Sequence, residues 1–222
     1  MGHAWSIAER EYIRHETRRG RRFAFETLRP AMTALVVVDM VPFFAEQNPY
    51  CRAVIAPINE LATALRLAGG VVAWVLPGPD PFDALSIAHN GVEGAAAYRG
   101  SGGVGPLPGR LCPELRAAAD DLFAEKTAAS AFFPGRCDLN ERLVARGVDT
   151  VLVAGTVTNV CVEATARDAR TLGYRTILVA DACAARTDAE HNATLHTFYR
   201  SFGDVRPTAD VLGLIASGAV AR

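Results

Sequence analysis

The sequence predicts an α/β protein: a three-layer, doubly wound sandwich with a mostly parallel, six-stranded sheet of the Rossmann-like kind. Short apolar runs rich in β-branched residues alternate with segments of helical periodicity, which is typical of parallel strands joined by helical crossovers. The runs are apolar along their whole length, as expected of strands buried on both faces. The chain has 222 residues, half of them hydrophobic, which suffices for one well-packed core. We expect this domain to span residues 31–222, after an N-terminal arm at residues 1–30.

Six strands are expected. Four of them are continuous apolar runs: ALVVVD at 34–39, GVVAWVL at 70–76, TVLVAG at 150–155 and RTILVAD at 175–181. Two less apolar segments complete the sheet: DLFAEK at 121–126 and GDVRP at 203–207.

Helices are expected between these strands, over residues 53–70, 138–147, 160–173 and 187–203. The first three end in glycine, which suits the left-handed C-cap of a helix. The fourth begins with Thr187 three residues before Glu190, which is the spacing of a capping box.

Residues 77–120 interrupt this alternation, because PGPDPFD and YRGSGGVGPLPG contain too many glycines and prolines for regular structure throughout. The segment is either a long surface connection or a pocket wall or lid. We expect the second, since long loops in compact domains are usually functional.

The composition excludes several classes of partner. Lys and Arg number 23 and Asp and Glu number 24, mixed along the chain, so neither a nucleic-acid surface nor a membrane surface is indicated. No apolar run approaches the roughly 18 residues of a membrane span, and the N-terminal segment lacks the core of a secretion signal. The five cysteines include no CxxC pair, so we expect reduced thiols in a cytoplasmic protein. The expected partners are a small-molecule substrate and copies of the chain itself.

Three reactive side chains follow predicted strands. Asp39 and Lys126 each end a strand, and Cys161 lies just beyond the strand at 150–155, where a helix begins. Each alone has an ordinary explanation, as a turn residue, a solvated lysine or an inert buried thiol. In an open parallel sheet, however, ligands bind beyond the carboxyl ends of the strands, where all three would meet.

That arrangement favours nucleophilic catalysis. A thiol at a helix N-terminus beside an ammonium group is expected to have a pKa below its usual value of about 8.5. Asp39 would supply the base that takes the thiol proton.

Three segments resemble the cysteine hydrolases of the isochorismatase-like superfamily: VVVDM, EKTAASAFF and, most specifically, GTVTNVCVEATARDA. The resemblance covers residues 33–215 and implies the isochorismatase-like fold. It also implies that Asp39, Lys126 and Cys161 form a catalytic triad.

The same resemblance implies a cis peptide bond between Thr156 and Val157, which would direct the backbone N–H groups of Val157 and Cys161 at an oxyanion. The candidate pocket residues are Phe44, Trp74, Phe132 and Thr158, although aromatic residues beside strands more often belong to the core.

The chain also departs from family patterns. In DMVPFF, the residues Val41, Phe43 and Phe44 stand where polar residues are common, so polar substrate contacts must come from elsewhere. The segment WVLPGPDPFD lacks the Asp and two His that hold a metal in the nicotinamidase branch. GSGGVG neither follows a clear strand nor starts a clear helix. We therefore expect no metal and no cofactor, and assign no role to His89, His191 or His196.

The resemblance implies a metal-independent hydrolase. It would cleave a C–N bond of a small carboxamide, ureido or N-carbamoyl compound through a cysteine thioester, releasing ammonia or an amine. CVEATARDA and TDAEHNATL are most similar to the ureidoacrylate amidohydrolase, biuret hydrolase and N-carbamoylsarcosine amidohydrolase side of the family. Two alternatives stay open: an isochorismate-type vinyl-ether hydrolase with Asp39 as acid and Cys161 idle, and a non-catalytic binding protein on the same fold.

The N-terminal arm carries six arginines between positions 10 and 22 and has no place in the sheet. A disordered tail is one interpretation. Since similar family members are usually oligomers, we expect a homo-oligomer, dimer or tetramer, in which the arm packs on a neighbouring subunit.

Overall fold

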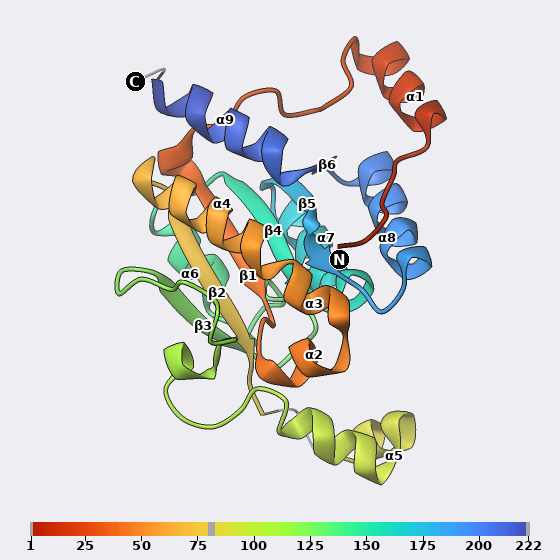
Figure 1. The fold of residues 1–222 in the computed structure, drawn as a ribbon, viewed down its shortest axis with the longest axis vertical. Helices are drawn as coiled ribbons and strands as arrows, with labels where there is room; N and C mark the ends of the chain where they lie inside the picture. The colour runs from red at the N-terminus through yellow and green to blue at the C-terminus, as the bar shows by residue number, and fades with distance from the viewer. Residues whose placement is uncertain (1, 80–82, 221–222) are drawn as a thin grey trace.

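The protein is built around one six-stranded sheet, seen in a computed structural model that describes residues 2–79 and 83–220 (Figure 1). All the strand pairs are parallel, and the strand order is β3-β2-β1-β4-β5-β6. The strands are β1 (Thr33–Val38), β2 (Val71–Pro77), β3 (Leu122–Lys126), β4 (Thr150–Thr156), β5 (Arg175–Ala184) and β6 (Asp204–Arg206). The predicted fold class is confirmed, and the sheet is parallel throughout rather than mostly parallel.

The strand order reverses between β1 and β4. From β1 the chain proceeds outward through β2 to β3, then returns to β4 on the other side of β1 and continues to β5 and β6. The crossovers therefore leave the sheet in opposite directions at this point, which opens a crevice at the carboxyl ends of β1 and β4.

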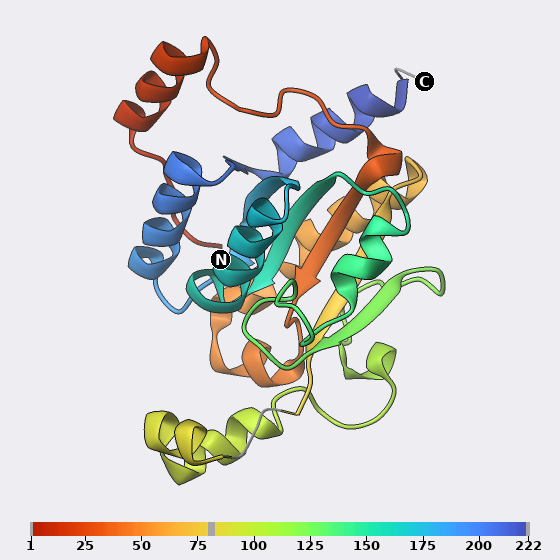
Figure 2. The ribbon, with the colours of Figure 1, turned by 180° about the vertical axis from the view of Figure 1, so that it is seen from behind.

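Helices cover both faces, so the sheet separates two hydrophobic cores (Figures 1 and 2). One layer contains α2 (Pro42–Gln47), α3 (Pro49–Ala53), α4 (Ile55–Leu67) and α9 (Thr208–Val220). The opposite layer contains α6 (Leu139–Val144), α7 (Glu163–Thr171) and α8 (Asp188–Ser201). In β1, Ala34, Val36 and Val38 face the second layer while Leu35 and Val37 face the first, which explains why the run is apolar throughout.

Local signals set several of the helix ends. Gly147 and Gly173, which follow α6 and α7, have φ of 67° and 103°, in the left-handed region that favours glycine. At the start of α8, Thr187 accepts a hydrogen bond from the backbone N–H of Glu190 at 3.2 Å. The Thr187 hydroxyl donates in turn to the Glu190 carboxylate at 2.9 Å.

The segment between β2 and β3 contains a helix, α5 (Ala84–Arg99), and a short 3₁₀ turn, η2 (Leu107–Arg110). The Asp83 side chain caps the first turn of α5 by accepting from the backbone N–H of Ser86. The helix is kinked at Gly91 and projects from the body of the molecule (Figure 1). Its inner side contributes to the pocket described below, as expected of a wall rather than a simple connection.

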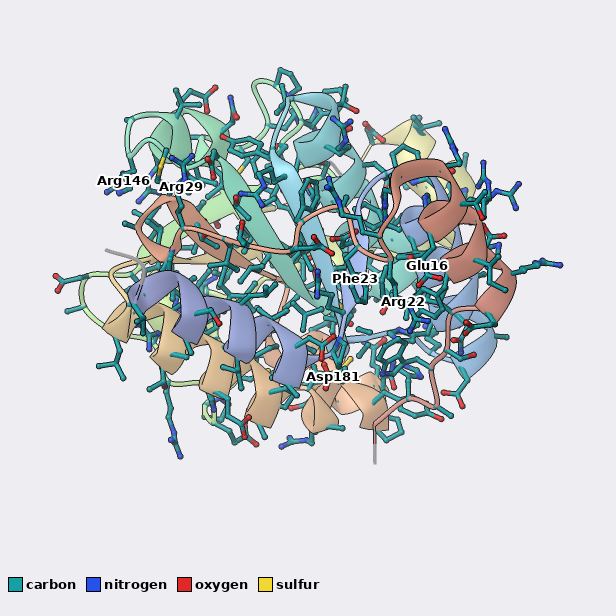
Figure 3. All side chains as sticks on the ribbon, turned by 90° about the horizontal axis from the view of Figure 1, so that it is seen from above. Glu16, Arg22, Phe23, Arg29, Arg146 and Asp181 are labelled. Atoms are coloured by element: carbon teal, nitrogen blue, oxygen red, sulfur yellow. The ribbon has the colours of Figure 1, made fainter. Side chains whose placement is uncertain are left out.

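The N-terminal arm contains α1 (Glu9–Arg19) and packs along α8 of its own chain (Figure 2). Glu16, Arg22 and Phe23 gather at this edge of the molecule (Figure 3), where Arg22 donates to Glu16. Asp204 also holds the arm: it is buried in β6 and accepts from the backbone N–H groups of Ala24 and Phe25 at 2.8 Å each. That the arm also contacts a neighbouring subunit stays a prediction.

The remaining short elements are η1 (Pro30–Met32), which leads into β1, and η3 (Thr158–Val162), a π-helical turn that leads into α7. Within the described ranges, no helix has the length and apolar character needed to cross a membrane.

Candidate active site

Asp39 is the first residue beyond β1, in the crevice where the strand order reverses. Its φ of 54° is the single positive value among the described non-glycine residues. Asp tolerates this region better than most residues, and such conformations concentrate at functional sites. A backbone hydrogen bond of 2.8 Å from Asp39 N–H to the Val75 carbonyl holds the conformation, and the side chain is 1% exposed.

Lys126 is the last residue of β3, two strands away from Asp39. Its ammonium group has three N–H donors and three acceptors in reach. These are the Asp39 Oδ2 at 2.8 Å, the carbonyl of Ala128 at 3.1 Å and the Sγ of Cys161 at 3.4 Å. Since Lys126 is 4% exposed, it is a fully engaged buried cation.

Cys161 lies in the π-helical turn η3, directly after β4. The peptide bond between Thr156 and Val157 is cis, and Val157 and Cys161 both line the same pocket. The approach to this turn requires glycine at position 155, whose φ is 112°. A Cβ atom there would lie 2.1 Å from the carbonyl oxygen of Val38. The close contact between β4 and β1 brings the turn with Cys161 beside Asp39.

The surroundings of Cys161 raise the pKa of its thiol, whereas the sequence analysis expected a lowered pKa. Burial raises the pKa of Cys161 and the carboxylate of Asp39 raises it further, outweighing the opposite effect of Lys126. The expected pKa below about 8.5 is therefore wrong. Burial also raises the pKa of Asp39, against the effect of Lys126. For Lys126, burial lowers the pKa but the charges of Asp39 and Cys161 prevail and raise it.

The resting site is thus an ion pair between Asp39 and Lys126 beside a neutral thiol. Within residues 2–79 and 83–220, no group donates a hydrogen bond to the Oδ1 atom of Asp39, which is buried. This oxygen remains available to accept a proton.

The triad forms the floor of a pocket of about 660 Å³, within the range typical of small-molecule sites. Phe44 lies on the wall, as predicted. Polar side chains come from η3, from the α2–α3 junction, from the entry to α8, and from α5 and its C-terminal loop, which belong to the segment expected to be a pocket wall or lid. They include Gln47, Asn48, His89, Asn90, Tyr98, Ser101, Asn159, Arg186 and Glu190. The sequence analysis assigned a substrate-binding role to none of these residues, because their segments meet only in the tertiary structure.

Three candidate pocket residues lie in the core instead. Trp74 is 0% exposed, points into the core shared with α4 and donates from Nε1 to the Asp121 carboxylate at 2.7 Å. Phe132 packs against Tyr174 in the opposite core. Thr158 is buried beneath the pocket, where its hydroxyl contacts Nδ1 of His191 at 2.9 Å.

The three histidines that were assigned no role from the sequence lie in different surroundings. In the part of the chain that the structure describes, no three His, Cys, Asp or Glu side chains are grouped to hold a metal ion. Of the segment PGPDPFD, residues 80–82 lie outside the described residues. His89 lines the pocket, His191 is buried behind it, and His196 lies 3.8 Å from the Glu11 carboxylate between α8 and α1.

Comparison with known proteins agrees with the fold described above. The Isochorismatase domain family matches residues 33–210. An uncharacterized isochorismatase family protein of Bacillus subtilis, YwoC, is 38% identical over 81% of this chain and 92% of that protein. The ureidoacrylate amidohydrolase RutB of Agrobacterium fabrum is 28% identical over 87% of this chain and 94% of that protein. The crystal structure of a cysteine hydrolase from Pseudomonas syringae pv. phaseolicola superposes with a TM-score of 0.74 at 28% identity, covering 88% of this chain and 97% of that one. The chain therefore belongs to the isochorismatase family of hydrolases.

Proposed function

We propose that the protein hydrolyses a C–N bond of a small carboxamide, ureido or N-carbamoyl compound through a thioester on Cys161. The observation that carries this proposal is the position of Lys126, whose ammonium group contacts both Asp39 and Cys161 on the pocket floor. One cation is thereby the counter-ion of the base and of the nucleophile. The amidohydrolase name of the RutB relative supports the same bond type.

Acylation begins with a neutral thiol, since burial and Asp39 disfavour a standing thiolate. Asp39 takes the thiol proton as the sulfur attacks the substrate carbonyl, and Lys126 stays beside the negative charge as it moves from oxygen to sulfur. The backbone N–H groups of Val157 and Cys161 would hold the resulting oxyanion, and a donor of this kind contributes about 3 to 4 kcal/mol. When the C–N bond breaks, Asp39 returns the proton to the leaving nitrogen.

Deacylation uses the same carboxylate. Asp39 takes a proton from water, the hydroxide attacks the thioester carbonyl, and the C–S bond breaks. The sulfur recovers the proton from Asp39, so the cycle ends with the acid product and the original thiol.

The far end of the substrate would meet the segment at the start of α8. Arg186 lines the pocket and, among the described residues, has no ion-pair partner, whereas Lys126 is already paired. A guanidinium group binds a carboxylate with two parallel hydrogen bonds. We therefore propose that the preferred substrates carry an anionic group opposite the scissile amide.

The test compares Cys161→Ala, Asp39→Asn and the double variant in an ammonia-release screen over ureides, carbamoyl amino acids, biuret, nicotinamide and maleamate. Both single variants should lose turnover by several orders of magnitude, and the double variant should be little worse than either, because the groups act as one unit. Mass spectrometry after acid quench should detect an acyl adduct that is absent from Cys161→Ala. An active Cys161→Ala with an inactive Asp39→Asn would instead support vinyl-ether hydrolysis with Asp39 as acid.

The homo-oligomer and the cytoplasmic location expected from the sequence stay predictions. Light scattering of the full chain measures the first directly.

A further inference from the structure

The first described residues of the N-terminal arm lie beside the entry to α8, a segment that lines the active-site pocket. Its backbone is held on α8 by Asn192, whose side-chain oxygen accepts from the N–H of Ser6 at 2.8 Å and whose side-chain amide donates to the carbonyl of Ala4 at 2.9 Å. Glu11, 2% exposed, accepts from Arg200 at 3.0 Å farther along α8. These contacts fix the register of the arm along α8 and place His3 at the entry of that helix.

Both ring nitrogens of His3 are engaged. Nε2 accepts from the backbone N–H of Ala185 at 2.9 Å, which assigns the ring proton to Nδ1. Nδ1 then donates to the Asp188 carboxylate at 2.6 Å. The His3 side chain is 2% exposed and that of Asp188 is 44% exposed. The two hydrogen bonds define one orientation of the buried ring.

The two faces of the His3 ring are also covered. Tyr50 of α3 stacks on one face with ring centroids 3.9 Å apart, and His191 of α8 stacks on the other at 4.2 Å. Burial lowers the pKa of His191 to about 3, so the stack holds without charge repulsion at neutral pH.

Every partner of His3 belongs to a segment that forms the pocket. Ala185 directly precedes Arg186, and its carbonyl accepts a hydrogen bond from the side chain of Asn48, which lines the pocket from the start of α3. His191 is one residue beyond Glu190 and contacts Thr158, next to the cis peptide bond. The triad, by contrast, is carried by β1, β3 and η3 and makes no contact with His3 among those described.

We propose that His3 is a positioning residue for substrate binding: the arm uses this ring to join α3 to the entry of α8 and thereby orients Arg186 and Glu190 in the pocket. The inference rests on the proposed function in that it takes the pocket above Cys161 as the substrate site. The arm is then part of the active site of its own chain, and its loss affects how an anionic substrate binds more than it affects the nucleophile.

The experiment measures the charge preference of the pocket without requiring a substrate. Cys161 is alkylated with neutral iodoacetamide and with anionic iodoacetate, and the ratio of the two rates at Cys161 is followed by mass spectrometry. Arg186→Ala gives the ratio for a pocket without this cation. Ile13→Ala, an exposed position on the same arm, is the matched control.

His3→Phe keeps both stacking faces but cannot accept from the Ala185 N–H, whereas His3→Gln retains an acceptor near that position. We expect His3→Phe to lower the ratio of the iodoacetate rate to the iodoacetamide rate by about fivefold or more. A fivefold change corresponds to a loss of about 1 kcal/mol in the interaction of the pocket with the anionic reagent. His3→Gln should restore most of the ratio and Ile13→Ala should leave it unchanged. His3→Phe should also increase the rate of amide hydrogen exchange over residues 184–191 and leave the exchange of the β3 amides unchanged.

Equal ratios in wild type and His3→Phe, or unchanged exchange over 184–191, would overturn the proposal. On the best amide substrate, the KM of His3→Phe should rise more than its kcat falls, and a loss confined to kcat would also contradict a positioning role. If the wild-type protein cleaves none of the amides, the proposed function fails while the alkylation ratio and the exchange data still decide the role of His3.

Discussion

Replacement of Lys126 by methionine tests the electrostatic reasoning most directly. Methionine keeps an unbranched side chain of similar length and removes the charge. In the wild-type protein, the ammonium group lies 2.8 Å from Asp39 and 3.4 Å from Cys161. It therefore stabilises the negative charge of the pair whichever of the two carries it.

The size of the effect follows from these distances. Two unit charges 3.4 Å apart interact by about 5 kcal/mol at an effective dielectric constant of about 20. Without Lys126, the pKa values of Asp39 and Cys161 would both rise further, and either group would have to carry its negative charge buried and unpaired. At about 1.4 kcal/mol per factor of ten, kcat/KM should fall by about three to four orders of magnitude at pH 7.

The assay is ammonia release by Lys126→Met between pH 6 and pH 10, with thermal unfolding as the control for folding. Part of the loss should be recovered as the pH rises, because loss of the counter-ion raises the pKa of the base and alkaline solution deprotonates it. Activity within tenfold of wild type at pH 7, or a loss that is the same at every pH, would refute the role assigned to Lys126.

Three further predictions concern the thiol, the core and metals. Asp39→Asn removes a charge that raises the pKa of Cys161, so the pH profile of Cys161 alkylation by iodoacetamide should move to lower pH even though turnover is lost; a shift to higher pH would contradict the assigned electrostatics. Trp74→Ala should lower the free energy of unfolding in urea by about 3 to 5 kcal/mol, as large-to-small core substitutions do. The folded variant should keep the wild-type KM, since Trp74 lies outside the pocket. A raised KM would indicate instead that Trp74 lines the pocket. Activity should survive EDTA, and a loss that zinc or manganese restores would replace this mechanism with a metal-assisted one.

The strands and the catalytic groups could be predicted from the sequence because their signals are local. An apolar run such as ALVVVD indicates a strand buried on both faces wherever it stands, and the six predicted strands are those of the sheet. Glycines 147 and 173 mark helix ends through their own backbone freedom. Parallel strands also share one carboxyl edge, so residues at their carboxyl ends, such as Asp39 and Lys126, lie on the same edge of the sheet. The strand order, which the tertiary structure decides, brings these two together.

Burial and the walls of the pocket were decided by the tertiary structure. The pKa of Cys161 was mispredicted because helix dipole and lysine are visible in the sequence, whereas the depth of burial and the distance to Asp39 are properties of the folded chain. Arg186 and Asn48 have no local motif, and they face one cavity only because the entry to α8 and the start of α3 are joined there. The path of the arm to His3 depends on contacts with residues about 180 positions away in the chain. Local sequence determines propensity, caps and periodicity, while desolvation and long-range contacts arise only when the whole chain is packed.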